Sequence, residues 1–282
     1  MKRKIITFLV LLFAISVFAG GPWTAGKKHG FAQIQATFPI RPYNKLFLYD
    51  GSTLELNRGV TDVSVQAYLE YGLGDKLSIV AAIPYKFVST DNDINTDAEM
   101  PLLSEGSLSG FGNFEFALKY QFLDRFFVSS FSIKADFNTG KQDIAKGLTT
   151  GFDASGYSLF WYFGKGFSSR FYSFFETGYT LRTNDYSDNI RLMIETGYMP
   201  ANDFWLALVF DFKKSMYNGN YYDENLRQTG LYTNNQEFFA YGLKASYELK
   251  SKIGFSASTF GALWGNYVAH SITINIGIYQ KW

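Results

Sequence analysis

The chain has 282 residues, a formal net charge of +1 and no cysteine. The balanced charge argues against a nucleic-acid partner, and the missing cysteines exclude disulfides, thiolate metal sites, a cysteine nucleophile and a lipoprotein anchor. Aromatic residues make up 19% of the chain, while the mean hydropathy is close to zero. This combination disfavours a bundle of membrane helices and is typical of a membrane barrel, whose strands turn one apolar face to lipid.

The first nineteen residues have the pattern of a secretory signal peptide. A basic cluster at 2–4 precedes the apolar stretch 5–18, and Val17 and Ala19 are the small residues expected before a cleavage site. An uncleaved membrane anchor is the alternative, but the apolar stretch is shorter than the roughly 20 residues that a spanning helix needs. We therefore expect a cleaved signal peptide over 1–19 and one mature domain over 20–282.

From residue 30 onward, apolar and polar residues alternate with a period of two, as in half-buried strands. Every second residue is apolar from Phe114 to Phe122, for example, and Glu115, Lys119 and Gln121 lie between them. Most such segments reach the ~9–11 residues that a tilted strand needs to cross a bilayer. We expect twelve strands, with ten to fourteen as the range, over 30–38, 60–73, 76–90, 110–123, 126–138, 152–164, 170–183, 189–199, 204–216, 235–249, 252–263 and 270–282.

Short connections between these segments alternate with longer polar ones. Short turns are expected near 74–75, 123–125, 165–169, 199–203 and 250–251, and long loops near 39–59, 91–109, 139–151, 184–188, 217–234 and 264–269. This asymmetry is typical of outer-membrane barrels, with periplasmic turns and extracellular loops. Unpaired backbone groups cost several kcal/mol in hydrocarbon, so the first strand must pair with the last. We predict an all-β, up-and-down antiparallel transmembrane barrel in the bacterial outer membrane.

The last segment carries a candidate assembly signal. Isoleucines alternate with polar or small residues from Ile272 to Ile278, and the chain stops at Trp282. A terminal aromatic residue resembles the signal that the barrel-assembly machinery recognises, although Gln280 occupies a position that is usually aromatic or apolar and Tyr279 lies one place off. An ordinary edge strand with a chance terminal tryptophan is the alternative. The expected partners are this machinery, outer-membrane lipid and lipopolysaccharide, and the expected state is a monomer.

The polar face of the strands would line the lumen. Lys or Arg on the lipid face would cost ~2–4 kcal/mol at mid-membrane, which fixes the register. These side chains either neutralise one another and fill the bore or border a solute path, because twelve strands lie between packed barrels of about eight and open channels of about sixteen. We interpret as lumen-lining Glu70, Glu115, Lys119, Lys134, Asp136, Glu176, Arg182, Arg191, Glu195, Asp211, Lys213 and Lys244.

Aromatic residues gather near the predicted strand ends and favour girdles at the membrane interfaces. They are Phe126, Phe127, Phe160, Trp161, Tyr162, Tyr172, Phe174, Phe175, Tyr198 and Trp205. Three of them, Tyr172, Phe174 and Trp205, have the lumen-facing parity. A partly apolar bore would suit an apolar solute.

One acidic loop resembles the start of a calcium-binding loop, with oxygen-bearing side chains at alternate positions. Thr96 and Leu102 occupy the positions where that loop needs glycine and glutamate. We therefore expect a solvated loop without a cofactor, and loose divalent-ion binding near lipopolysaccharide is the alternative. The side chains concerned are Asp91, Asp93, Asn95 and Asp97.

The adjacent His270 and Ser271 invite comparison with outer-membrane phospholipases, which use a serine and a histidine. A catalytic triad needs its side chains within hydrogen-bond reach, whereas adjacent residues of a strand face opposite ways. We therefore expect no enzyme, and an outer-membrane lipid hydrolase stays as an alternative.

Several turn and strand signatures resemble the outer-membrane proteins grouped as "meta-pathway of phenol degradation" barrels, which are related to hydrophobic-compound transporters of the long-chain fatty acid type. These signatures span about half of the mature chain, and Asn113 stands where the family usually has aspartate. The resemblance implies uptake of small apolar or aromatic molecules. The expected function is passive passage or binding of such molecules, and an occluded structural or surface-interaction barrel is the alternative. The signatures are Gly21-Pro22-Trp23-Thr24, Gly26, Gly30-Phe31, the segment 69–77, Gly110-Phe111-Gly112-Asn113 and Leu118-Lys119-Tyr120.

Overall fold

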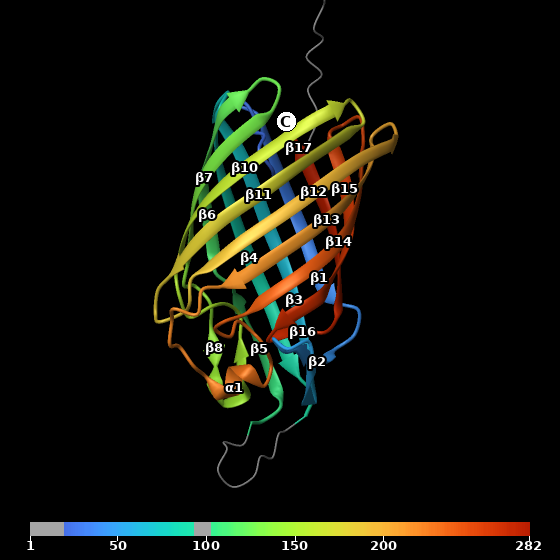
Figure 1. Ribbon diagram of the computed structural model, residues 1–282. Coiled ribbons are helices and arrows are strands. Elements are labelled where there is room, and N and C mark those ends of the chain that lie inside the picture. Colours follow the sequence, from blue (N-terminus) through green and yellow to red (C-terminus); the bar gives the residue numbers. More distant parts are fainter. Residues whose placement is uncertain (1–19, 93–102) are drawn as a thin grey trace, which may run out of the picture.

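Twelve long antiparallel strands form the wall of the molecule (Figure 1). The computed structural model describes residues 20–92 and 103–282. The wall strands are β1 (Gly30–Pro39), β3 (Thr53–Gly74), β4 (Leu77–Thr90), β6 (Phe114–Asp124), β7 (Val128–Phe137), β10 (Gly156–Ser168), β11 (Phe171–Arg182), β12 (Asn189–Ala201), β13 (Phe204–Ser215), β14 (Glu237–Glu248), β15 (Ile253–Asn266) and β17 (Ile272–Lys281).

The sheet closes on itself. Each wall strand pairs with its neighbour along the chain, and β1 pairs with β17 from Phe31 opposite Lys281 to Pro39 opposite Thr273. The short turns and the C-terminus lie at one end, and the long loops lie at the other (Figure 1). The predicted closed all-β barrel of twelve strands is confirmed.

Three predicted segments differ clearly from the observed strands, and one of them, 152–164, is displaced by four residues relative to β10. β3 begins at Thr53 instead of residue 60, because it extends beyond the wall to pair with β2 (Tyr43–Phe47). The predicted strand 110–123 is interrupted between β5 (Gly106–Phe111) and β6. At the break, the Asn113 amide donates hydrogen bonds to the backbone oxygens of Phe137, Phe152 and Ala154. Asn113 therefore ties the end of β7 to the next loop instead of continuing a strand.

The outward face of the wall is apolar and exposed. On β6, Phe116, Leu118 and Tyr120 are exposed, whereas Lys119 and Gln121, on the other face of the strand, are buried. A wall of exposed large apolar side chains would be a liability in water. It suits a barrel surrounded by hydrocarbon.

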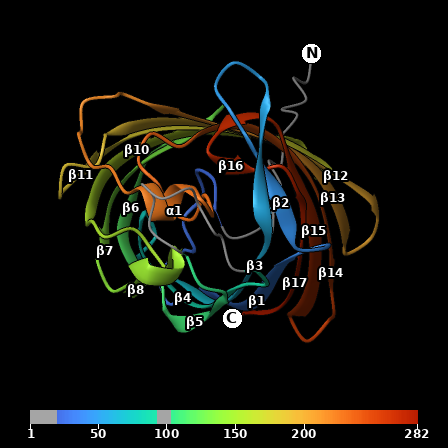
Figure 2. The ribbon, with the colours of Figure 1, turned by 90° about the horizontal axis from the view of Figure 1, so that it is seen from below.

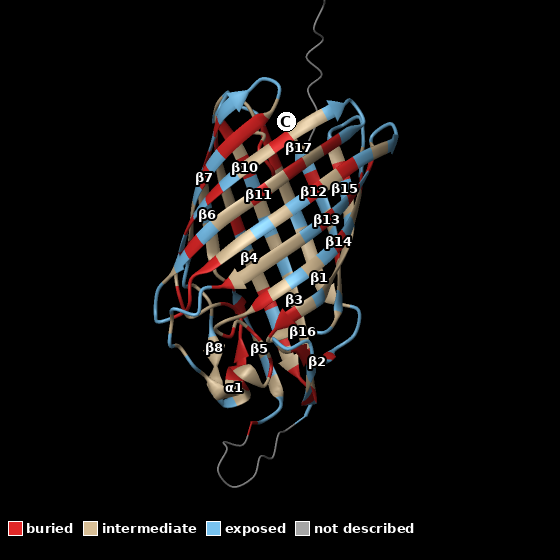
Figure 3. Cartoon of the chain, viewed as in Figure 1, coloured by how far each residue is buried: buried red, intermediate tan, exposed pale blue. Residues whose placement is uncertain are grey.

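The long-loop end carries short elements that the sequence analysis treated as loops. Buried residues gather there, on β2 and at Leu148 and Thr149 beside β8 (Figure 3). No helix in the described ranges is long and apolar enough to cross a membrane. Besides β2 and β5, these elements are β8 (Gln142–Asp143), the 3-10 helix η1 (Ile144–Lys146), β9 (Leu148–Thr149), α1 (Glu224–Arg227) and β16 (Val268–Ala269).

These elements form a structure that we call the loop cap, with its own apolar core of Tyr43, Leu46, Leu56, Val60, Val88, Leu148 and Leu231. Arg58 is buried beside this core. Its guanidinium donates to the carbonyl oxygen of Lys146 at 3.0 Å, and to the Thr90 hydroxyl and the carbonyl oxygens of Asn92 and Ser104 at 2.9 Å. One side chain thus joins β3, β4 and two loops, and the cap is held as a unit.

The barrel lumen as candidate functional site

The structure places all twelve predicted charged residues on the inward-facing parity of the wall, six acidic and six basic. The most deeply buried pair joins β6 to β3, where Lys119 Nζ lies 2.8 Å from Glu70 Oε1. A buried charge is tolerated when it is paired and hydrogen-bonded. The other pairs are Lys134–Glu115 at 3.1 Å, Arg182–Asp136 at 3.3 Å, Lys244–Glu195 at 2.7 Å, and Arg191 with Asp211 at 2.6 Å and Glu176 at 3.9 Å.

The predicted set omits further inward pairs, among them Lys281 with Glu248 near the short-turn end and Lys86 with Asp62. Lys86 Nζ lies 2.7 Å from Asp62 Oδ2 and donates a hydrogen bond to the Tyr232 hydroxyl at 2.6 Å. Both charged residues lie inside predicted strands and have the inward parity, so alternation alone could have identified them. Tyr232 lies in a predicted loop, where no periodicity indicates its direction.

Lys213 makes no ion pair with any described residue, but its Nζ lies 5.3 Å from the ring centre of Phe152. The same ring lies 4.0 Å from the Arg182 guanidinium and 5.0 Å and 5.5 Å from the rings of Tyr232 and Tyr186. We call these five residues the mouth cluster. Aromatic rings from loops therefore meet cations from the wall at the long-loop end, an arrangement that favours cation–π contact.

The segment 20–26 lies inside the barrel at the short-turn end, and Figure 2 shows its dark blue ribbon within the ring of strands. Its backbone is bound by wall side chains. Thr24 N–H donates to Gln121 Oε1 at 3.1 Å, and Ala25 N–H donates to Ser78 Oγ at 3.0 Å. The Ser130 hydroxyl donates to the carbonyl oxygen of Pro22. The segment thus reaches from β4 and β6 to β7 and narrows the bore.

An aromatic cluster holds this segment against the far wall. The Trp23 ring packs edge-on against Tyr172 and Phe174, at 6.0 Å and 6.1 Å between ring centres. Trp205 lies 5.4 Å from Tyr172, whose hydroxyl donates to Glu195 Oε1 at 2.7 Å. We call Trp23, Tyr172, Phe174 and Trp205 the tryptophan cluster. Parity indicated the inward direction of the three wall residues, whereas their contact with Trp23 had no sequence signal.

Inward rings lie flat against the wall where a neighbouring strand offers glycine. Tyr172 stands opposite Gly197, and Tyr279 stands opposite Gly254. A Cβ atom on either glycine would come within 2.1 Å of the ring. A larger residue at these positions would push the ring toward the bore, so the glycines keep the lumen clear.

Some aromatic residues expected in the girdles point inward instead. Phe160 is buried and lies over Gly178 of β11, its cross-strand partner. Its neighbour Trp161 is the outward residue and donates from Nε1 to Ser129 Oγ at 2.7 Å. The girdle interpretation is therefore wrong for Phe160 and Tyr162, because both lie on the inward parity of β10.

The described residues hold no group of three or more side chains suited to a metal ion. Of the acidic loop, Asp93, Asn95 and Asp97 lie outside the described residues. The His270 ring packs against Phe47 with 4.5 Å between ring centres, and the Ser271 hydroxyl donates to the Ile272 carbonyl oxygen at 3.4 Å. Neither contact joins a nucleophile to a base.

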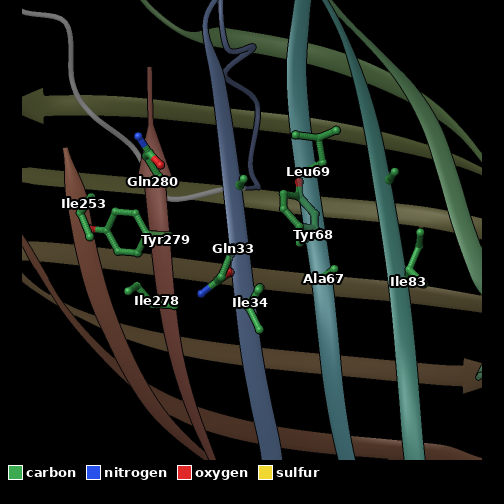
Figure 4. Close-up of a pocket in the computed structure, with 12 residues that line it drawn as sticks. Gln33, Ile34, Ala67, Tyr68, Leu69, Ile83, Ile253, Ile278, Tyr279 and Gln280 are labelled. Carbon is green, nitrogen blue, oxygen red and sulfur yellow. The ribbon is translucent and has the colours of Figure 1, made fainter. Parts of the chain in front are cut away.

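A hollow of about 480 Å³ crosses the wall surface over β15, β17, β1, β3 and β4 (Figure 4). Ile34, Leu69 and Ile278 border it and are exposed, and Ala67 lies between them. β1 pairs continuously with β17 and with β3 along this stretch. The hollow is therefore a depression of the apolar outer surface, and the strands beneath it stay hydrogen-bonded.

A scan against protein-family models and a search of curated proteins found no match. Solved structures do match. The COG4313 outer membrane channel from Pseudomonas putida F1 has a TM-score of 0.71 at 13% identity, over 94% of this chain and 100% of that chain. The TodX deltaS2S3 mutant, a monoaromatic hydrocarbon channel, has a TM-score of 0.50 at 9% identity, over 91% of both chains.

The β domain of the Bordetella autotransporter BrkA also matches, with a TM-score of 0.52 at 10% identity, over 91% of this chain and 100% of that chain. At these identities the likeness shows the fold. The neighbours confirm the predicted resemblance to outer-membrane channels at that level. Because an autotransporter domain shares the fold, the activity has to be argued from the lumen.

Proposed function

We propose that the mature chain resides in the bacterial outer membrane as a monomer and gives small, apolar or aromatic molecules passive passage. The observation that carries this proposal is the layered lumen: an aromatic cluster lies at each end of a bore whose charges, Lys213 excepted, are paired. Ring faces provide apolar and cation–π contacts for a small aromatic solute. Paired charges of both signs favour no ion, so solute selection falls to the two clusters.

Passage also requires sites that hold a solute weakly. The wall strands are paired along their length, so the segment 20–26 is the part of the bore that can move with the least loss of hydrogen bonding. Its attachment rests on a few hydrogen bonds with wall side chains, two of them from Thr24 to Gln121, and on the packing of Trp23. We infer that displacement of this segment widens the path.

Two of the similar solved structures support the proposal. The COG4313 protein is an outer membrane channel, and TodX is a monoaromatic hydrocarbon channel. The preceding segment 1–19 fits a cleaved export signal. The amphipathic strand β17, followed by Trp282, fits a client of the barrel-assembly machinery.

A second candidate function is an occluded barrel that displays its loops. The observation that favours it is that the segment 20–26 lies inside one end of the bore and the loop cap lies at the other. This barrel would be folded in lipid but would pass nothing.

Conductance in planar bilayers separates the two functions. We expect the refolded mature protein to give small discrete steps, and Trp23→Ala to give larger ones because the segment loses its aromatic anchor. Trp161→Ala removes an outward-facing tryptophan and serves as the matched control, with conductance unchanged. A folded protein that is silent both as wild type and as Trp23→Ala would overturn passage and favour the occluded barrel.

Uptake into cells then tests the solute class. Cells that carry the wild-type protein should accumulate a radiolabelled monoaromatic compound faster than cells that carry Lys213→Ala and Phe152→Ala together. Equal rates for both, with equal amounts of folded barrel, would remove the mouth cluster from the transport path.

A further inference from the structure

An overhang on the outside of the barrel encloses a cavity that the transport path does not use. The chain from Ile40 to Pro42, between β1 and β2, projects beside the wall at the long-loop end (Figure 1). Beneath it lies a cavity of about 700 Å³. Its volume falls in the range of small-molecule sites.

The inner side of this cavity is apolar and belongs to the membrane-facing wall. Tyr241, Leu263 and Ile272 line it and are exposed. Gly261 lines it as well, and a Cβ atom there would meet only ordinary contacts, 3.5 Å from Ile272 and 3.8 Å from Tyr241. Leu263 stands at a shift of the β14–β15 register, where β15 has one extra residue. Such a bulge redirects a side chain at the rim of a barrel.

The rim of the cavity is basic. Arg41, Lys45 and His270 line it, and no acidic residue does so among the described residues. Arg41 is exposed and makes no hydrogen bond or ion pair with the described part of the chain. Lys45 is paired with Glu55 at 2.5 Å, and both side chains are open to solvent. Arg41 is therefore the rim cation that is available to an outside ligand.

The overhang is held at both ends, so the cavity is preformed. Ile40 N–H donates to the carbonyl oxygen of Ile272 at 3.0 Å. At the other end Tyr43 is buried in the loop cap, and its hydroxyl donates to the carbonyl oxygen of Thr229 at 2.8 Å. His270 N–H donates to the carbonyl oxygen of Lys45 at 2.9 Å, which ties β16 to β2. A ligand would not have to order this site.

We propose that this cavity binds one phosphorylated lipid of the outer leaflet. Its acyl chain lies along Leu263 and Ile272, and its phosphate contacts Arg41 and His270. The occupant follows from charge complementarity, because a basic rim without a carboxylate in its lining stands directly above apolar residues that face hydrocarbon. The position of the cavity along the barrel axis fits as well, since it lies where the membrane-facing wall meets the long loops.

Native mass spectrometry of the delipidated barrel in detergent tests this site. The probes are two lipids with identical acyl chains, phosphatidic acid and diacylglycerol. We expect tighter binding of phosphatidic acid to the wild type. Arg41→Gln should weaken it about fivefold, the factor for one basic side chain near an anionic lipid surface, and should leave diacylglycerol unchanged. Lys250→Gln, an exposed lysine in the turn at the opposite end, is the matched control and should change neither lipid.

Gly261→Val fills the apolar part without removing charge and should weaken both lipids alike. Equal affinity of the wild type for the two lipids, or equal effects of Arg41→Gln and Lys250→Gln, would overturn the proposal. Displacement of phosphatidic acid by inorganic phosphate at the same concentration would also overturn it, since the site would then select a free anion. Unchanged binding in Gly261→Val would show that the acyl chain lies elsewhere and would overturn it too.

Discussion

Different parts of the chain lie at the two ends of the bore. At the short-turn end, one segment of the chain, 20–26, enters the lumen and is held by side chains of the wall. At the long-loop end, five short strands and two short helices interlock around a core of their own and around buried Arg58. The segment 20–26 can move without disturbing the wall. The loop cap can open only if several loops separate together.

The two ends of the bore therefore differ in how easily they can move. Regions with few buried apolar contacts open at the lowest free energy, and regions with many open only in larger units. A channel built this way would keep its loop cap and would regulate its bore from the short-turn end. The following substitutions test that distinction.

The largest loss of stability is expected from substitution of Lys119, which contacts the segment 20–26. Its Nζ pairs with Glu70 and also donates to the carbonyl oxygen of Gly21 at 3.4 Å. Lys119→Met leaves the Glu70 carboxylate buried and unpaired, which should lower the free energy of unfolding by about 3–5 kcal/mol. Urea unfolding in detergent measures it, and adding Glu70→Leu should recover most of the loss. The exposed pair provides the control, since Lys45→Met should cost about 1 kcal/mol or less.

A somewhat smaller and more local effect is expected in the loop cap. Arg58→Met removes four hydrogen bonds, and each buried acceptor left without a donor costs about 1–3 kcal/mol. Because water can reach some of these carbonyl oxygens after the cap loosens, we expect about 2–4 kcal/mol in total. Amide hydrogen exchange should rise over 142–149 and stay unchanged in β11. An equal rise in exchange over 142–149 and in β11, or no rise beyond that of the surface control Arg125→Met, would show that Arg58 does not hold the cap together.

The smallest effect concerns acid sensitivity of the loop 183–188. Burial alone raises the pKa of the Asp188 carboxyl, but hydrogen bonds from Asn218, the Arg182 N–H and the Tyr179 hydroxyl outweigh burial and hold that pKa below its usual range. The contribution to stability is therefore present above the unfolded pKa, near about 4, and is lost as pH falls through the lower folded pKa.

Asp188→Asn should accordingly cost about 1 kcal/mol near neutral pH, and the cost should shrink toward about pH 2.5. Thermal unfolding in detergent at the two pH values measures it, with the exposed Asp185→Asn as control. If the stability cost of Asp188→Asn grew on acidification, the pKa of Asp188 would not be lowered in the folded protein.

The wall was predictable because a membrane imposes alternation on every strand. Glu115 and Lys119 had to face the lumen once Phe116 and Leu118 faced hydrocarbon, and the same rule covers all twelve predicted charges. Phe160 shows that parity, and not position near a strand end, decides the direction of an aromatic ring.

The loop cap and the position of the segment 20–26 could not be predicted in the same way. Arg58 interrupts the apolar positions of an alternating stretch, Leu54, Leu56 and Val60, and nothing local indicates that its guanidinium joins distant loops. Trp23 carries the family resemblance, yet its place depends on Tyr172 and Phe174, about 150 residues away along the chain. Contacts of this range depend on the closed wall as a template. Sequence pattern alone therefore indicates the cylinder and leaves its ends undefined.

The most direct test locks the segment 20–26 to the wall. The chain has no cysteine, so Ala25→Cys with Ser78→Cys introduces a single thiol pair where Ala25 N lies 3.0 Å from Ser78 Oγ. Conductance is recorded in planar bilayers before and after oxidation. We predict that oxidation lowers conductance and that a reductant restores it, while each single cysteine variant is insensitive to both. Conductance that persists unchanged in the fully oxidised double variant would contradict passage by movement of this segment.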